Sequence, residues 1–261
     1  MIKICHRWLL VLLMNFIGQL AYAQFNEIIR SGRPGQSIGP YTVGRQIFQI
    51  QSGVDYFGYT TESSVNEGHG IVHNTVIRYG ISEFFELSTL VDYRGEKLTD
   101  ASGNTSKSGV SALDIGGRAH IYSGSGWVPS VGFQLRFRLP ILSLDYEINK
   151  IAPRFILVTS QHLTESISLV TNTGASWNGV NNKATGHYVV NVGFPIKGKL
   201  GAFFENYGNF TADNFETRFD GGFAFLVNND LQLDFLGGYG TNNGIQDYFV
   251  GTGVSWRTRR K

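Results

Sequence analysis

Apolar and polar residues alternate with a period of two along most of this chain. In Phe84–Tyr93, Phe85 and Leu87 lie on one face of an extended strand, and Glu86 and Asp92 lie on the other. Successive side chains of a strand point to opposite faces, so this pattern predicts a strand with one apolar and one polar side. The same pattern recurs through the chain and predicts an all-β protein.

The strand predicted at Val128–Leu139 indicates which face meets lipid. Phe133 and Leu135 share one face, and Arg136 and Arg138 share the other. Arginine on the lipid face of a membrane β-barrel costs about 2–4 kcal/mol at the midplane. We therefore expect Phe133, Leu135, Leu233 and Phe235 to face lipid, and Gln134, Arg136, Gln232 and Asp234 to point inward.

Twelve segments carry this alternation, and the connections between them differ in length. The predicted strands are 45–57, 71–79, 84–93, 110–121, 128–139, 153–160, 166–175, 187–194, 199–207, 217–226, 231–239 and 247–256. Short connections (80–83, 122–127, 161–165, 195–198, 227–230) alternate with longer polar ones (58–70, 94–109, 140–152, 176–186, 208–216, 240–246). Short periplasmic turns and longer external loops are typical of outer-membrane barrels. The sequence predicts a transmembrane antiparallel up-and-down β-barrel of about twelve strands, spanning 45–261, with both ends periplasmic.

Aromatic residues near the predicted strand ends fit this interpretation, since interfacial girdles flank the lipid-facing band of a barrel. They are Tyr56, Tyr93 and Tyr239 towards the predicted external loops, and Tyr79, Phe85, Phe194, Phe225 and Trp256 towards the turns. A soluble β-sandwich with scattered core aromatics is the alternative, and the clustering at strand ends argues against it.

The first 23 residues have the features of a signal peptide. Lys3 and Arg7 form a positive start, an apolar stretch follows, and Ala21-Tyr22-Ala23 is a small-residue cleavage site. We expect cleavage before Gln24 and export to the outer membrane. Residues 24–44 are then a periplasmic N-terminal segment, because its Pro and Gly residues argue against regular structure. It is either a free tail or a segment folded into the lower mouth of the barrel.

Composition excludes several functions. Without residues 1–23 the chain keeps 20 basic and 20 acidic residues, so its charge gives no reason to expect a nucleic-acid partner. The single cysteine, Cys5, leaves with the signal peptide, so no thiol chemistry or cysteine metal site is expected.

Four stretches resemble the outer-membrane proteins of the MetA-pathway of phenol degradation family, also called transporters. They are Arg33–Gly53, Ile77–Leu87, Asp220–Asn242 and Asp247–Trp256. The resemblance implies a channel for small molecules, with hydrophobic or aromatic compounds as the implied solutes. Two stretches depart from the family pattern: Arg136–Ser143 only partly matches its Leu-Pro-Thr-Gly run, and the basic residues 257–261 follow the last aromatic.

Function in a barrel depends on the inward residues, which line the pore. The predicted pore-lining residues are Arg78, Glu86, Asp92, Asp114, Arg118, Arg136, Arg138, Arg154, Glu205, Arg218, Asp220 and Asp234. Arginines concentrate on the fourth to sixth predicted strands and acids on the ninth to eleventh. This separation predicts either a charged constriction with a transverse field, or a filled barrel in which ion pairs neutralise one another.

Enzymatic motifs are weak. No His-x-Ser pair of the kind used by outer-membrane phospholipases occurs, although Ser160 and His162 have the reverse order. His69 and His73 are four residues apart, a metal-binding spacing for a helix but not for a loop and strand start. We expect no enzyme activity, no cofactor and no metal. The expected partners are the lipid bilayer, the outer-membrane assembly machinery and a small-molecule solute.

Three functions compete, and a membrane-embedded hydrolase is the distant third. The first is passive or facilitated diffusion of small molecules through the barrel. The second is a closed barrel with a structural or envelope-assembly role and no transport.

One pair of inward residues makes a sharp prediction. Symmetrical closure of the turn at Gly80–Glu83 places Arg78 opposite Glu86 on the inward face. We expect a cross-strand ion pair there, worth about 0.2–1 kcal/mol in a partly water-filled lumen.

Overall fold

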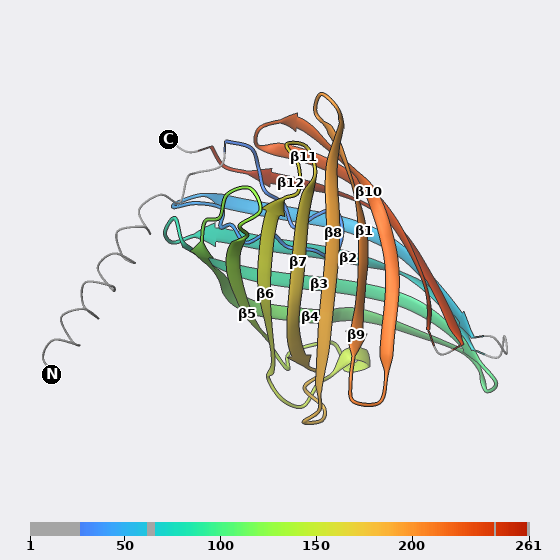
Figure 1. Ribbon diagram of the computed structural model, residues 1–261. Helices are drawn as coiled ribbons and strands as arrows, with labels where there is room; N and C mark the ends of the chain where they lie inside the picture. Colours follow the sequence, from blue (N-terminus) through green and yellow to red (C-terminus); the bar gives the residue numbers. More distant parts are fainter. Residues whose placement is uncertain (1–26, 62–65, 243, 260–261) are drawn as a thin grey trace, which may run out of the picture.

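A computed structural model describes residues 27–61, 66–242 and 244–259. They form one closed antiparallel β-barrel, in which each strand pairs with its neighbours along the chain and β1 pairs with β12 (Figure 1). The predicted signal peptide, residues 1–23, lies outside the described residues. The barrel confirms the predicted fold class and strand number.

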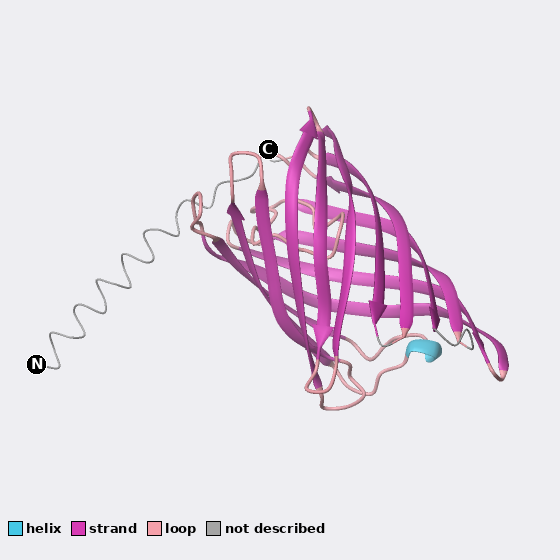
Figure 2. Cartoon of the chain, turned by 45° about the vertical axis from the view of Figure 1, so that its right-hand side comes forward, coloured by secondary structure: helices cyan, strands magenta, loops and turns pink. Residues whose placement is uncertain are grey.

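The strands are long and follow one another with short connections (Figure 2). Their bounds are β1 Phe48–Thr61, β2 Glu67–Gly80, β3 Phe85–Asp100, β4 Gly103–Tyr122, β5 Ser130–Arg138, β6 Ala152–His162, β7 Ser168–Trp177, β8 Ala184–Lys197, β9 Leu200–Phe210, β10 Phe215–Asn228, β11 Leu231–Asn242 and β12 Ile245–Arg257. A short 3₁₀ turn, η2 (Leu144–Tyr146), lies in the connection between β5 and β6.

The prediction of longer external loops is wrong for several connections. Only residues 101–102 separate β3 from β4, and β1 and β2 extend to Thr61 and from Glu67. The strands continue beyond the predicted ends because the β3–β4 ladder does, with Lys97 opposite Ser106 and Lys107 opposite Glu96, although this part is polar on both faces. Residues 139–151 remain the one long connection of the described chain.

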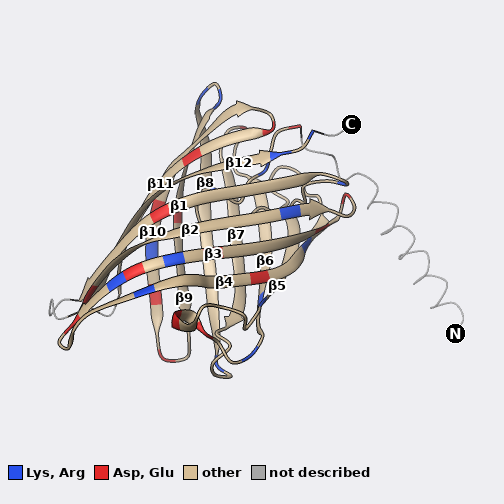
Figure 3. Cartoon of the chain, turned by 180° about the vertical axis from the view of Figure 1, so that it is seen from behind, with Lys and Arg blue, Asp and Glu red and all other residues tan. Residues whose placement is uncertain are grey.

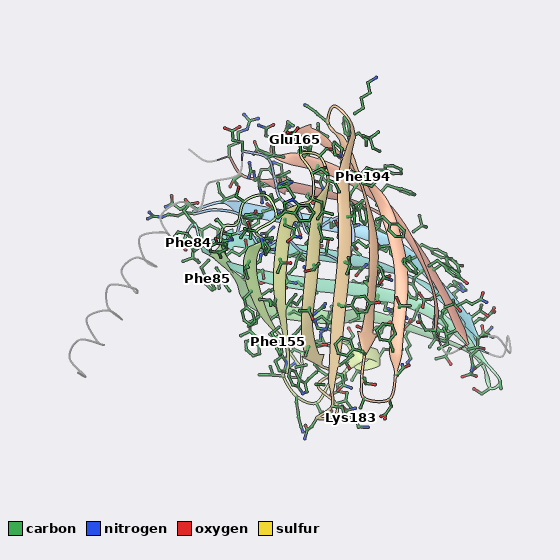
Figure 4. All side chains as sticks on the ribbon, viewed as in Figure 1. Phe84, Phe85, Phe155, Glu165, Lys183 and Phe194 are labelled. Atoms are coloured by element: carbon green, nitrogen blue, oxygen red, sulfur yellow. The ribbon has the colours of Figure 1, made fainter. Side chains whose placement is uncertain are left out.

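The two faces of the wall agree with the predicted alternation. Leu233 and Phe235 are exposed on the outside, whereas Gln134, Gln232 and Asp234 are buried. All eight aromatics predicted near the strand ends are exposed. Figure 4 shows Glu165 and Phe194 at one end of the barrel and Lys183 at the other, in agreement with the order of turns. The outer surface is therefore apolar and aromatic, and the polar residues are directed to the lumen.

No helix in the described part of the chain is long and apolar enough to cross a membrane.

Residues 27–47 precede β1 and enter the barrel instead of extending away from it (Figure 1). Ile29, Val43 and Ile47 are buried, and the backbone of Ile29 donates to Asn229 in the β10–β11 turn. Gln46 donates to Gly80 at the β2–β3 turn. The segment is thus attached at both ends to the β10–β11 and β2–β3 turns, two of the turns predicted to be short and periplasmic. We call that end of the barrel the short-turn end, and residues 27–47 the plug.

Candidate functional site

The lumen and the plug together form the polar interior of the molecule. Buried carboxylates and arginines of the barrel wall bind backbone groups of the plug, which has no strands of its own to satisfy them. Three groups of contacts hold it, at β2–β4, at β7–β9 and at β11–β2.

The first group centres on Glu86, which is fully buried. Arg78 donates to it through Nε and Nη2, each at 2.8 Å, and Arg118 donates at 2.8 and 3.1 Å. The backbone N–H of Val43 also donates to Glu86, at 2.8 Å. Two guanidinium groups therefore share one carboxylate, and we call these three side chains the Glu86 hub.

The hub also binds plug carbonyl groups. Arg78 donates to the carbonyls of Arg30 and Tyr41, at 2.9 and 3.2 Å, and Arg118 donates to that of Gly39 at 2.6 Å. Buried carbonyl and N–H groups need partners, since an unpaired one costs about 1–3 kcal/mol. The hub thus supplies partners for an irregular segment.

The predicted Arg78–Glu86 ion pair is confirmed, but its register and setting differ from the prediction. Arg78 lies opposite Ser88, and Glu86 lies opposite Gly80, so the ladder is shifted by two residues. The turn begins after Gly80 and closes through Ile81 and Ser82 donating to Phe85. The long arginine side chain spans the diagonal. The pair is buried and shared with Arg118, not solvated.

The second group of contacts lies on β7–β9. Glu205, which is fully buried, accepts from the backbone N–H of Gln36 at 2.6 Å and of Ser37 at 3.0 Å, and from Asn191 at 2.7 Å. Asn172 both accepts from Ile38 N–H and donates to its carbonyl, at 2.8 and 2.9 Å. Glu205 and Asn172 thus bind N–H and carbonyl groups of the plug backbone, as a neighbouring strand would do.

The third group centres on Arg33 of the plug. Its guanidinium lies 3.2 Å from Asp234 and 3.5 Å from Asp55, and it donates to Asn74 at 3.0 Å. A Cβ atom at Gly53 or Gly253 would lie only 2.2 or 2.3 Å from it. Glycine at these two positions therefore makes room for the guanidinium.

The remaining predicted residues fall into paired and unpaired sets. Arg138 pairs with Asp114 at 2.7 Å, and Arg218 pairs with Asp247 at 2.9 Å. Asp220 lies opposite Glu205 and is buried, and neither of its oxygens has a hydrogen-bond partner. Asp92 has one such oxygen. Arg136 and Arg154 have no ion pair among the described residues.

Charged positions of both signs lie on neighbouring strands (Figure 3). The charge pattern of the sequence predicted either a charged constriction or a barrel filled by ion pairs, and the structure has features of both. Most lumenal arginines form ion pairs, while a few charges have no ion-pair partner among the described residues. No group of three His, Cys, Asp or Glu residues placed to hold a metal ion occurs in the described ranges.

Two cavities lie on either side of the plug. One of about 640 Å³ is bounded by Gln36, and we call it the aromatic cavity. It is lined by both aromatic and charged side chains: Phe57, Tyr59, Tyr207, Tyr248, Phe249, Asp55, Arg94, Arg218 and Asp247. The other, of about 400 Å³, is bounded by Pro34 and lies among the β6–β7 and β8–β9 turns. Residues Pro34–Gln36 therefore separate an aromatic cavity from the end of the barrel that carries the short turns.

Sequence reasoning missed the plug residues Arg33 and Tyr41 and the wall residues Asn172, which binds the plug, and Asn191, which binds Glu205. Asn172 and Asn191 share the inward parity, and uncharged polar residues on that parity were the available signal. Arg33 lies in a segment without periodicity, so its contact with Asp234, 201 residues away, had no local signal.

Comparison with solved structures identifies other barrels of the same fold. An outer membrane channel from Pseudomonas putida F1 is 15% identical and superposes with a TM-score of 0.64 over 85% of this chain and 99% of that chain. The transport unit of the autotransporter AIDA-I from Escherichia coli is 9% identical, with a TM-score of 0.59 over 93% and 96%. At these identities the likeness shows the fold alone.

A third solved structure, the translocator domain of the autotransporter NalP from Neisseria meningitidis, is 12% identical. Its TM-score is 0.53, over 81% of this chain and 88% of that one. A search of curated protein sequences finds no match.

The family comparison is more specific than the fold. Residues 31–258 match the family described as the MetA-pathway of phenol degradation, and this range includes most of the plug and every strand. The resemblance drawn from the four sequence stretches is therefore confirmed over the whole barrel. This chain belongs to the MetA-pathway of phenol degradation family of outer-membrane β-barrel proteins.

Proposed function

We propose that this protein is an outer-membrane channel for small molecules, with the plug closing the short-turn end of its lumen. The carrying observation is the division of one polar lumen into two cavities by Pro34–Gln36. A barrel with a purely structural role has no need of an aromatic cavity of about 640 Å³, which is within the usual size of a small-molecule site.

The aromatic cavity supports the solute class that the family implies. Phe57, Tyr59, Tyr207 and Phe249 offer ring faces, and Arg94 lies over the Phe57 ring at 4.0 Å. Rings with a polar edge bind apolar and aromatic molecules and keep a hydrogen-bonding group in reach. The solute is therefore a small molecule with an apolar or aromatic body, taken up by passive or facilitated diffusion.

Export and insertion complete this proposal. Residues 1–23 direct export and are removed, and the plug and both ends of the mature chain then lie on the periplasmic side. Trp256 near the end of β12 serves the outer-membrane assembly machinery as a terminal aromatic, although Arg257–Arg259 follow it. N-terminal sequencing of protein from outer-membrane fractions tests this, with Gln24 as the expected first residue.

Single-channel recording of the purified full-length protein in a planar bilayer tests the channel itself. We expect a small conductance for the wild type, because the plug fills part of the lumen. Glu205→Ala removes the acceptor of two plug N–H groups and should raise the conductance several-fold. Glu165→Ala, at an exposed turn of the same barrel end, is the matched control and should leave it unchanged.

The closed structural barrel is the competing function, and the extent of plug bonding favours it. It predicts no conductance for either the wild type or Glu205→Ala. Conductance that appears in Glu205→Ala but not in the wild type would indicate a channel that needs a signal to open.

A further inference from the structure

Arg136 and Arg154 stand directly opposite each other on β5 and β6. Like charges in directly opposed positions destabilise a sheet, so a neutralising counter-charge would stabilise this part of the barrel. Arg136 donates from Nε to Ser88 at 3.2 Å, and no described carboxylate lies within 4 Å of either guanidinium group. Arg154 has no hydrogen bond to any described residue. We call these two side chains the arginine pair.

The carboxylates near the arginine pair are too few to neutralise it, and one of them already binds another arginine. Asp114, one strand away, accepts from Arg138 with both oxygens, at 2.7 and 3.3 Å. Asp92 on β3 has one oxygen without a partner. Three arginines thus share this wall with two carboxylates, and an excess of positive charge remains.

The arginine pair is accessible from the lumen. Phe155 and Leu157 are exposed on the outer face of β6, as Figure 4 shows for Phe155, so Arg154 points inward. Arg154 is nevertheless exposed, and the water that reaches it is lumenal. The residues opposite the pair on its two sides, Gly116 and Ser176, are small. Neither of these neighbours carries a charge, and Arg154 is exposed while Arg136 is half-buried.

Small neighbours and hydroxyl groups complete an arrangement that suits an anion. Ser88 already contacts Arg136, and Ser176 lies opposite Arg154. Guanidinium groups present paired N–H donors in a geometry that matches carboxylate and phosphate oxygens. Two of them side by side, one exposed and one half-buried and neither with a carboxylate partner, provide donors for a planar or tetrahedral oxyanion.

We propose that the arginine pair is an oxyanion-binding subsite of the lumen, which selects solutes that carry a carboxylate or phosphate group. This proposal rests on the proposed channel function and narrows its solute class from apolar molecules to those that also carry such a group. The subsite is separate from the aromatic cavity, whose lining includes neither arginine.

Direct binding to full-length protein in detergent tests the subsite without any need for conduction. The probes are 4-fluorobenzoate, followed by ¹⁹F NMR, and inorganic phosphate, followed by its competition with that signal. We expect binding to the wild type and about ten-fold weaker binding to R136Q/R154Q, since charged hydrogen bonds are lost. The control K150Q/K183Q removes two positive charges from the exposed β5–β6 and β7–β8 connections and should bind as the wild type does.

Reversal potentials in a potassium chloride gradient give the second measurement. The wild type should prefer anions, R136Q/R154Q should lose that preference, and K150Q/K183Q should keep it. Retention of compact, heat-modifiable migration in gels shows that each variant is folded.

The outcomes separate the two proposals. Equal binding by the wild type and R136Q/R154Q, or equal loss in both variants, overturns the subsite whatever the conductance. Binding that depends on the arginine pair, with no conductance in either the wild type or Glu205→Ala, overturns the channel and keeps the subsite. Binding of fluorobenzoate without competition by phosphate restricts the subsite to carboxylates, and the reverse restricts it to phosphates.

Discussion

The Glu86 hub and the arginine pair contain similar residues in opposite states. In the hub, Arg78 and Arg118 are buried and both donate to Glu86. In the pair, Arg136 and Arg154 face each other without a carboxylate. Both sets lie on the inward parity of neighbouring strands, so parity alone does not distinguish them. Their partners do.

The difference separates two roles of charged residues in the lumen, one structural and one in solute binding. A buried charge must be paired and hydrogen-bonded, and the hub achieves this while binding the plug backbone. A charge left open to lumenal water has a low cost to keep and stays available to a solute. The buried arginines of the Glu86 hub therefore have a structural role, and the arginine pair is left to contact a solute.

The largest expected effect is at the hub. Glu86→Gln leaves two buried guanidinium groups without a negative partner and should lower the free energy of unfolding by about 3–5 kcal/mol. Urea unfolding in lipid vesicles, followed by tryptophan fluorescence, measures it. Ser88→Ala, on the same face of β3 but with one weak contact, is the control. A loss below 1 kcal/mol for Glu86→Gln would mean that the hub is not the main anchor of the plug.

The next effect concerns Arg33, which links the plug to Asp234 on β11 and Asp55 on β1. Arg33→Ala leaves Asp234 buried without a cation and should cost about 1–3 kcal/mol while raising the conductance. Gly253→Val should raise the conductance as well, because its side chain would occupy the place of the Arg33 guanidinium. If Gly253→Val conducts as the wild type does, the Arg33 contact does not hold the plug in place.

The twelve strands were predictable because each membrane-spanning stretch separates lipid from lumen. Phe235 and Asp234 must lie on opposite faces, and that requirement is written locally in the sequence. The strand ends were not predictable, since Lys97 and Lys107 lie where both faces meet water and the alternation disappears. Strand length beyond the membrane depends on backbone pairing. Polar residues on both faces give no alternation from which that pairing could be predicted.

The site was predictable only as a list of inward charges. The Arg78–Glu86 contact followed from closing a short turn, and it survived a two-residue error in register because arginine is long. The plug contacts were not accessible to such reasoning. Arg33 meets Asp234 and Glu205 meets Gln36 across more than 150 residues, and no local pattern encodes such distant contacts.

The ion pair of Arg218 and Asp247 is intermediate between the buried hub and the arginine pair. Arg218 and Asp247 are paired at 2.9 Å, but both side chains are partly exposed at the aromatic cavity. A double-mutant cycle with Arg218→Gln and Asp247→Asn should give a coupling of about 0.2–1 kcal/mol. The same cycle at Arg78 and Glu86 is the comparison and should give a larger value. Equal couplings would show that burial does not separate the two classes.

The smallest effect is expected at the arginine pair, and it has the opposite sign. Arg154→Gln removes one of two facing positive charges, so the repulsion between directly opposed side chains disappears. No described partner is left unpaired, and the longer apolar stem of arginine is the only packing lost. The free energy of unfolding should therefore stay within about 0.5 kcal/mol of the wild type or rise slightly. Unfolding in the same vesicles at low and high salt measures it, and the gain should shrink as salt screens the repulsion. A loss above 1 kcal/mol would mean that Arg154 has a structural partner and is not held open for a solute.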